Sequence, residues 1–387
     1  MNIPRSVIAL GFVSMFMDIS SEMIHALLPA YMSSALGASA MLIGIIEGSA
    51  EALALILKVV SGKMSDRWGK RKPFLVAGYG LGALSKPLFA FAAAPWSISI
   101  ARLVDRTGKG LRGAPRDALI ADVTPAEKRG EAYGLRQSMD SIGAFLGPVI
   151  AIGLMLLFQN DYRAVFLAAI VPGLFSVAIL LLFVRESGVR RSSGIQVDMK
   201  MGKPFWLVIL VAVMFTFSRY SEAFLVLRAQ NTGMEPYLLP VVFIVMNLFY
   251  ALGAWPLGKF SDRFGRKGML ASGIVALLAA DGVLAFAGTP QQVLVGASLW
   301  GLHMAFTQGI FSALIAETTH AKNRATGFGI FGLVTGVTVF FSAFFAGAVW
   351  DNFGAEKTFL SGAIFCLLTL FGLALLNGKE SIKHVKY

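Results

Sequence analysis

One short basic segment occurs twice in this chain, each time between two long apolar runs. It reads GKMSDRWGKRK over residues 62–72 and GKFSDRFGRK over residues 258–267, almost half a chain length later. A second pair supports the duplication, because ALIAD at residues 118–122 matches ALIAE at residues 313–317. Repetition at this spacing predicts two similar halves with the same order of elements.

The apolar runs are long enough to cross a lipid bilayer. Apolar residues make up 56% of the chain and charged residues 14%, and the mean hydropathy of +0.70 excludes a soluble domain of this length. Within lipid the backbone is satisfied only in helices or closed barrels, and barrel strands alternate too weakly to give this pattern. We therefore predict an all-α membrane protein with twelve transmembrane helices. The expected spans cover residues 6–32, 40–60, 74–93, 96–119, 131–157, 162–184, 204–228, 237–257, 268–287, 290–316, 326–349 and 357–377.

The net charge of +12 is concentrated in a few short segments. Residues 62–72, 185–203, 258–267 and 379–387 together carry the whole excess of positive charge. Short basic loops stay on the cytoplasmic side of a membrane, so we expect these segments and both termini in the cytoplasm. Charge placed in this way argues against nucleic acid as a partner and indicates a lipid bilayer instead.

The polar stretch 185–203 predicts a cytoplasmic linker between two domains. The domains expected on either side are six-helix bundles over residues 1–184 and 204–387. The first apolar run is interrupted by Asp18 and Glu22, so we expect a retained span and not a cleaved secretory signal.

The duplicated segment follows the pattern G-x-x-x-D-R-x-G-[KR]-[KR], which resembles the signature loop of the major facilitator superfamily of transporters. The resemblance covers essentially the full chain and implies two pseudo-symmetric six-helix bundles with a substrate site at their interface. It also implies a multi-pass protein of the bacterial inner membrane and, by family default, a monomer. In the family the loop aspartate pairs with basic residues near helix ends and latches the halves in one state. The resemblance gives that role here to Asp66, Arg67, Asp262 and Arg263.

A second family pattern, associated with antiporters, is matched in part on the expected fifth span. The residues that agree with G-x8-G-x3-G-P are Gly134, Gly143, Gly147 and Pro148. The paired glycine that follows in the family is replaced by Ala151 and Ile152. The partial match therefore leaves two interpretations open. The protein could work as an antiporter, or these glycines only allow close helix packing.

Five basic residues follow one face of the expected fourth span. They are Arg102, Arg106, Lys109, Arg112 and Arg116. At 100° per residue they lie within an arc of about 120°. Each would cost ~2.5–3.5 kcal/mol at the bilayer centre, so this basic stripe must face acidic partners or a watery cavity. The superfamily lines its cavity with spans 1, 4, 7 and 10, so the resemblance also turns the stripe inward.

Two interpretations of the basic stripe stay open. In the first, Arg and acidic residues pair across helices and hold or gate the two halves, which concerns Arg112, Arg116, Arg136 and Asp140. In the second, Arg102, Arg106 and Lys109 bind an anionic substrate, because guanidinium forks match carboxylate or phosphate in bidentate geometry. The substrate-binding candidates are Arg102, Arg106, Lys109, His25, Arg219, Trp300 and His303.

Proton coupling needs a group whose proton affinity changes between the outward and inward states. A carboxylate that alternates between burial and contact with a cation behaves in this way. The candidates, on the expected spans 1, 2 and 7, are Asp18, Glu22, Glu47, Glu51 and Glu222. His25 and His303 titrate near neutrality and are candidates for a relay or simply for a hydrogen bond. Asp281, alone in the ninth span, is expected to be a packing or local hydrogen-bond feature.

The sequence shows no Walker loop, no Cys/His metal pattern and no nucleophile motif, and a single cysteine, Cys366, forms no disulfide framework. We therefore expect no enzyme, no cofactor and no metal site. The preferred hypothesis is a proton-coupled, alternating-access secondary transporter of a small organic anion, such as a carboxylate-rich metabolite or a siderophore. The alternative is a proton-antiporting multidrug efflux pump for amphipathic or cationic compounds, which fits the acidic spans 1 and 2 and the phenylalanines of residues 340–345. A sensor that uses the transporter fold is a third class, for which the short loops offer no effector surface.

Overall fold

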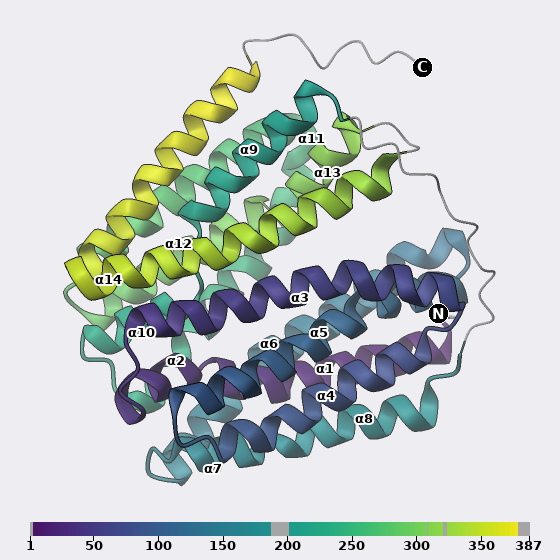
Figure 1. The fold of residues 1–387 in the computed structure, drawn as a ribbon, viewed down its shortest axis with the longest axis horizontal. Helices are drawn as coiled ribbons and strands as arrows, with labels where there is room; N and C mark the ends of the chain where they lie inside the picture. Colours follow the sequence, from purple (N-terminus) through teal and green to yellow (C-terminus); the bar gives the residue numbers. More distant parts are fainter. Residues whose placement is uncertain (1–2, 187–200, 308, 320–322, 378–387) are drawn as a thin grey trace. The chain divides into compact units, whose positions relative to one another are not determined.

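The computed structural model describes residues 3–186, 201–307, 309–319 and 323–377. All secondary structure in these ranges is helical (Figure 1), which confirms the all-α prediction. The first half contains α1 (Arg5–His25), α2 (Leu28–Ala30), the π-helical turn η1 (Tyr31–Ala35), α3 (Ala40–Trp68), α4 (Lys72–Ala90), α5 (Pro95–Val123), η2 (Ala126–Lys128), α6 (Arg129–Leu157), α7 (Tyr162–Ala168) and α8 (Ile170–Phe183). The second half contains α9 (Lys203–Ser218), α10 (Ala223–Asn231), η3 (Pro236–Leu238), α11 (Val241–Ala285), α12 (Pro290–Thr307), α13 (Ile310–Thr318) and α14 (Arg324–Asn377).

Nine helical segments within the described ranges are long and apolar enough to cross a membrane. Neither α4 nor α5 is among them, because α5 carries the basic stripe and α4 carries lysines among several glycines. The last of the nine covers Thr326–Ala374, and α14 bends within it at Gly354, where φ is +85°. The protein is therefore a multi-pass membrane protein, while the count of twelve spans and the side on which the termini lie stay predictions.

Some of the membrane segments are interrupted. Between α9 and α10, residues 219–222 leave the helix, although the two helices form one candidate span from Lys203 to Asn231. Likewise α12 and α13 share one span, with Gly309 at a φ of +72° directly before α13. In contrast, α5 continues for 29 residues. Irregular backbone at membrane depth occurs where it is buried in protein or lines a cavity, so these breaks are candidate functional positions.

The chain divides into two compact units. Unit 1 contains Met1–Ala38, Ser49–Gly194 and Met234–Ile244, and unit 2 contains Ser39–Gly48, Ile195–Gly233 and Val245–Tyr387. The expected domains, residues 1–184 and 204–387, differ from these units at two short segments. The first ten residues of the α3 region group with unit 2, and the residues around η3 group with unit 1.

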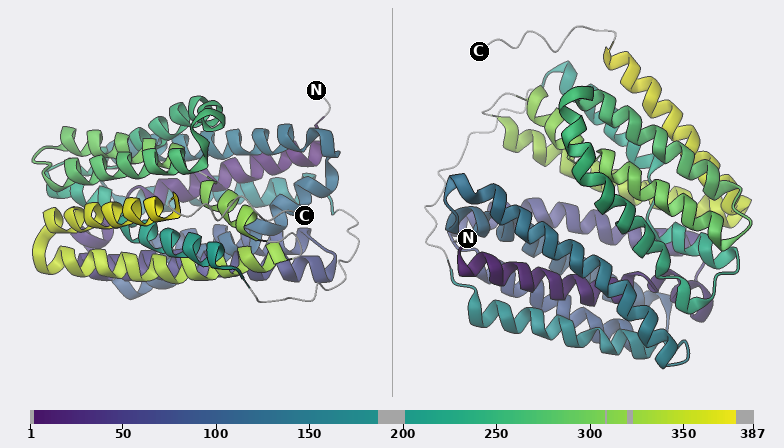
Figure 2. Two further views of the ribbon diagram at one scale, coloured as in Figure 1. Left: turned by 90° about the horizontal axis from the view of Figure 1, so that it is seen from above. Right: turned by 180° about the vertical axis from the view of Figure 1, so that it is seen from behind.

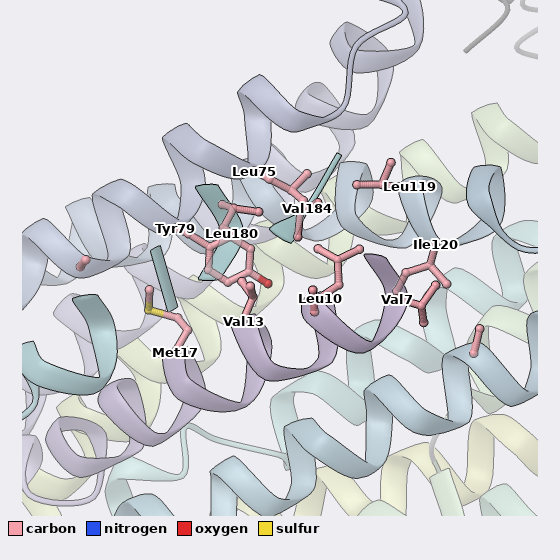
Figure 3. Close-up of a cluster of buried hydrophobic side chains, with 13 residues drawn as sticks. Val7, Leu10, Val13, Met17, Leu75, Tyr79, Leu119, Ile120, Leu180 and Val184 are labelled. Carbon is pink, nitrogen blue, oxygen red and sulfur yellow. The ribbon is translucent and has the colours of Figure 1, made fainter. Parts of the chain in front are cut away.

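Unit 1 is a helical bundle in which α1 packs against α6 and α8 while α4 packs against α5 (Figures 1 and 2). Apolar side chains three or four residues apart share one face of a helix, and α1 presents such a face to α4, α5 and α8 (Figure 3). The side chains in this contact are Val7, Leu10, Val13, Met17, Leu75, Tyr79, Ile120 and Leu180. Lipid tails are as apolar as these residues, so the packing itself stabilises the bundle.

Glycines bring α4 and α5 into backbone contact. A Cβ on Gly78 would lie 2.7 Å from the carbonyl oxygen of Gly108, and a Cβ on Gly108 would lie 2.5 Å from the carbonyl oxygen of Gly78. Small residues at both positions therefore let the helices approach closely. This approach places the basic stripe of α5 directly beside α4.

The two signature loops share one backbone requirement. Gly69 has a φ of +65° and Gly265 a φ of +67°, which is the left-handed region that residues with a side chain rarely adopt. Each glycine ends one helical segment and redirects the chain before the basic residues that follow. The duplicated glycine is thus explained by a duplicated turn.

Candidate functional site

The basic stripe lies along one uninterrupted helix, α5. Arg102, Arg106 and Arg112 are buried, with at most 7% of each residue exposed. Lys109 lies at the centre of the stripe and its side chain is exposed. Like charges on one helix face repel, so neighbouring helices must supply the balance.

Two arginines of the stripe meet carboxylates at distances longer than a hydrogen bond. Nη1 of Arg102 lies 3.8 Å from Oδ2 of Asp105, and Nη1 of Arg106 lies 3.7 Å from Oε2 of Glu51 on α3. Lys109 forms no ion pair with any carboxylate among the described side chains. The acidic side chains in its surroundings are Asp18, Glu22 and Glu51.

Asp105 pairs with a lysine that the sequence analysis did not single out. Lys86 of α4 is 1% exposed, and its Nζ donates to Oδ1 of Asp105 at 2.8 Å and to Oγ of Ser21 at 3.0 Å. The hydroxyl of Ser85 donates to the same carboxylate oxygen at 3.2 Å. Asp105 is therefore matched by Lys86, which leaves an excess of positive charge along the stripe.

The last two arginines of the stripe join helices to one another. The guanidinium of Arg112 lies over the ring of Tyr79, 4.7 Å from its centroid, in a cation–π contact. Arg116 donates to Oγ of Ser14 on α1 at 2.8 Å and lies 3.8 Å from Oδ2 of Asp140 on α6. These contacts connect α5 with α4, α1 and α6 inside unit 1, and the expected role in holding or gating the two halves stays a prediction.

The acidic face of α1 lies against α6. A Cβ on Gly143 would lie 2.9 Å from Cβ of Asp18, and a Cβ on Gly147 would lie 2.7 Å from Cβ of Glu22. The glycine pattern of α6 thus allows α1 to approach at two carboxylates. Further along the face, Oε2 of Glu22 lies 3.6 Å from Nδ1 of His25.

The candidates of unit 2 occupy three places. Arg219 and Glu222 lie in the break between α9 and α10 and form an ion pair at 3.6 Å. Trp300 and His303, one turn apart on α12, are buried, with their ring centroids 5.3 Å apart, and Nε1 of Trp300 has no hydrogen-bond partner in the described structure. Glu47, 4% exposed, lies in the α3 segment of this unit.

In the first signature loop, the contact to Asp66 comes from Arg71. Nη1 of Arg71 donates to Oδ1 of Asp66, and its Nε donates to Oδ2 of Asp122, near the end of α5, at 3.3 Å. Arg67 is exposed instead. Arg71 therefore connects the loop with the end of α5, and the sequence analysis did not name it.

The second signature loop shows a related pair. Arg266 forms an ion pair with Glu317, the counterpart of Asp122 in the duplicated ALIA segment. The side chains of Asp262 and Arg263 lie outside the described residues, so their expected role stays a prediction. Both loops thus join a basic residue after the glycine turn to a carboxylate at the end of the second span that follows.

The described side chains contain no group of three or more His, Cys, Asp or Glu that could hold a metal ion. The family match and the transporter fold of its structural neighbours define this multi-pass chain of two helical units as a membrane transporter and not an enzyme. The chain belongs to the major facilitator superfamily, whose family model matches residues 10–247 and 210–386.

Two relatives and one solved structure illustrate the family. An uncharacterised transporter of this superfamily from Methanocaldococcus jannaschii is 32% identical over 381 residues, which cover 96% of this chain and 94% of the relative. The multidrug resistance protein MdtH of Yersinia enterocolitica is 31% identical over 159 residues, covering 41% of this chain and 36% of MdtH. The crystal structure of the nucleoside transporter NupG aligns with a TM-score of 0.75 at 15% identity, covering 98% of this chain and 100% of NupG. The structural likeness shows the shared fold.

Proposed function

We propose that this protein is a proton-coupled secondary transporter of a small organic anion, such as a carboxylate-rich metabolite or a siderophore. The observation that carries the proposal is the excess of positive charge on α5. The charge of Asp105 is already balanced by Lys86, and Arg102 and Arg106 lie buried on the same face of α5. Lys109 follows Arg106 by three residues on this face and is exposed, without an ion pair among the described residues.

This arrangement suits an anion with more than one acceptor oxygen. The guanidinium groups of Arg102 and Arg106, one turn apart, offer forked hydrogen-bond donors, and the ammonium group of Lys109 adds a point charge. At 1.5 Å per residue the three groups extend along ~10 Å of helix. A polycarboxylate or a phosphate ester presents oxygens at a similar spacing. A monovalent cation would be repelled by the same groups.

Coupling to protons follows from the pair between Arg106 and Glu51. Glu51 is 39% exposed at its side chain and lies 3.7 Å from the guanidinium. An anion that takes over Arg106 removes the cation from Glu51, and a carboxylate that loses its cation binds a proton more readily. Anion and proton would therefore bind together, which is the requirement for symport.

The proposal is tested by ligand-dependent stability of the purified protein. A ligand that binds the folded state at 100 times its Kd stabilises it by about 2.7 kcal/mol. We expect citrate or another polycarboxylate to raise the melting temperature of the wild type and not of Lys109→Gln, while Lys109→Arg retains the rise. Equal stabilisation of wild type and Lys109→Gln would exclude the stripe as the anion site.

Efflux of amphipathic or cationic compounds by proton exchange is the second candidate. Two observations favour it: the partial match with the multidrug resistance protein MdtH, and the approach of α6 glycines to Asp18 and Glu22. In this mechanism a cationic compound and a proton compete for the carboxylates of α1. Stabilisation by a lipophilic cation that is lost in Glu22→Gln would support efflux and remove the anion proposal.

The signature loops have a conformational role in this account. We infer that Arg71, held between Asp66 and Asp122, belongs to the latch that the family resemblance implies, together with Arg112, Arg116 and Asp140. Breaking such a latch shifts a conformational equilibrium without removing a substrate contact. We also propose that the protein lies in a bacterial inner membrane with its basic loops in the cytoplasm and that it is, by family default, a monomer.

A further inference from the structure

Asp281 is a fully buried carboxyl group in unit 2. It lies in the second part of α11 and has no exposed surface. Its Oδ1 has no hydrogen-bond partner in the described structure. Its Oδ2 meets one polar atom, Sγ of Cys366 on α14, at 3.9 Å.

Tight packing closes the site around this carboxyl group. A Cβ on Gly362 of α14 would lie 2.7 Å from Oδ2 of Asp281 and 3.2 Å from the ring of Tyr220. The hydroxyl of Tyr220 is occupied by Oγ of Ser361 at 2.7 Å. Among the described side chains, the titratable groups that face Asp281 are Cys366 and Tyr220, and both are neutral at pH 7 in their ordinary state.

No cation balances Asp281. Among the residues that the structure describes, no Lys, Arg or His forms an ion pair with it. An ionised carboxylate without a partner in an apolar interior is so costly that the group takes up a proton instead. We propose that Asp281 is a proton-binding site of unit 2, which holds one proton in this structure and exchanges it through the break between α9 and α10.

Polar side chains connect Asp281 with that break. Cys366 lies near Ser218, the last residue of α9, and Tyr220 lies in the break itself. The partly exposed Arg219 lies between them in sequence. A movement of α9 against α10 changes what faces the carboxyl group, and contact with water or with Arg219 would release its proton. The role of this proton in transport rests on the proposed function, whereas its presence does not.

The experiment is infrared difference spectroscopy of the full chain in lipid nanodiscs at pH 7. The wild type should show a C=O stretching band of a protonated carboxyl group that is lost in Asp281→Asn and unchanged in Glu356→Gln, a surface carboxylate of the same unit. Cys366→Ala should shift the band, because the thiol is the polar contact of Oδ2. A difference spectrum without such a band would overturn the proposal.

Two further readouts keep the test decisive. If Asp281→Asn does not fold, Cys366→Ala carries the test, and an unshifted band contradicts the assignment. Transfer into D2O should move the band to lower frequency within hours, and a band that stays in place for days would exclude exchange through the break. These spectra need no substrate, so the two proposals can fail independently. If the band is present and the protein does not transport anions, only the proposed function is excluded. If the band is absent and anion transport is observed, only the assignment of a proton to Asp281 is excluded.

Discussion

Lys86 shows how a single charged residue is accommodated inside a membrane protein. Its side chain is 1% exposed, and its ammonium group donates to Asp105 and Ser21. Removing one partner of a buried pair leaves the other charge uncompensated, at a cost of about 3–5 kcal/mol. We therefore expect Lys86→Met to lower the free energy of unfolding in detergent by this amount.

A matched double variant separates charge from packing. Lys86→Met combined with Asp105→Leu leaves neither charge behind and should recover most of the lost stability. If the double variant unfolds as easily as Lys86→Met, the pair is not the source of the loss.

Glu51 gives a second prediction for a single residue. Its carboxylate and an anionic substrate compete for Arg106, 3.7 Å away. Glu51→Gln should bind a polycarboxylate at least as tightly as the wild type, because the competing charge is gone, and should still exchange anion across the membrane. It should lose accumulation driven by a proton gradient, whereas Glu356→Gln should keep it. Proton-driven accumulation that survives in Glu51→Gln would assign coupling to another carboxylate.

Sequence reasoning reached some of these residues and missed others for physical reasons. The stripe on α5 is visible because its members repeat at helical spacing along one element. Lys86 was missed although a lone lysine in an apolar span already requires a partner. Arg71 was passed over for Arg67, since only the three-dimensional turn at Gly69 shows which of the two points toward Asp66.

Among the elements, α4 and α5 form the contact that holds the stripe. Gly108→Ala would place a methyl group 2.5 Å from the carbonyl oxygen of Gly78 and 2.9 Å from the amide nitrogen of Gly82. Backbone cannot yield easily, so we expect a loss of about 1–3 kcal/mol in stability. Gly80→Ala on α4 has nothing within 4 Å and is the matched control. Equal melting temperatures for the two variants would contradict the close contact.

The breaks in the helices could not be predicted from the sequence. Residues 219–222 and Gly309 lie within apolar runs long enough for a continuous helix, and hydropathy does not register a local loss of helical backbone. The bends at Gly265 and Gly354 are different, because each glycine stands at the junction of two runs that the sequence already separates. Tertiary packing determines the helix breaks at residues 219–222 and Gly309, whereas the local backbone conformation of glycine determines the bends at Gly265 and Gly354.

For the whole molecule, the repeat predicted two similar halves, and the family match extends over both. The basic segments give a separate prediction, namely which side of the membrane each loop faces. In a Cys366→Ala background, an impermeant maleimide should label Gln291→Cys on intact bacterial cells and should label Ser193→Cys only after permeabilisation. The reverse pattern would invert the topology.

The central claim, that α5 binds an anion which moves with a proton, is tested most directly in proteoliposomes that contain a trapped pH dye. Polycarboxylates, including a citrate-based siderophore, and lipophilic cations are added in parallel to wild type, Lys109→Gln and the surface control Lys357→Gln. We predict that a polycarboxylate drives proton movement in the wild type and in Lys357→Gln, and that Lys109→Gln abolishes it. Proton movement in response to lipophilic cations alone, unchanged in Lys109→Gln, would contradict the account and leave the stripe as a set of helix contacts.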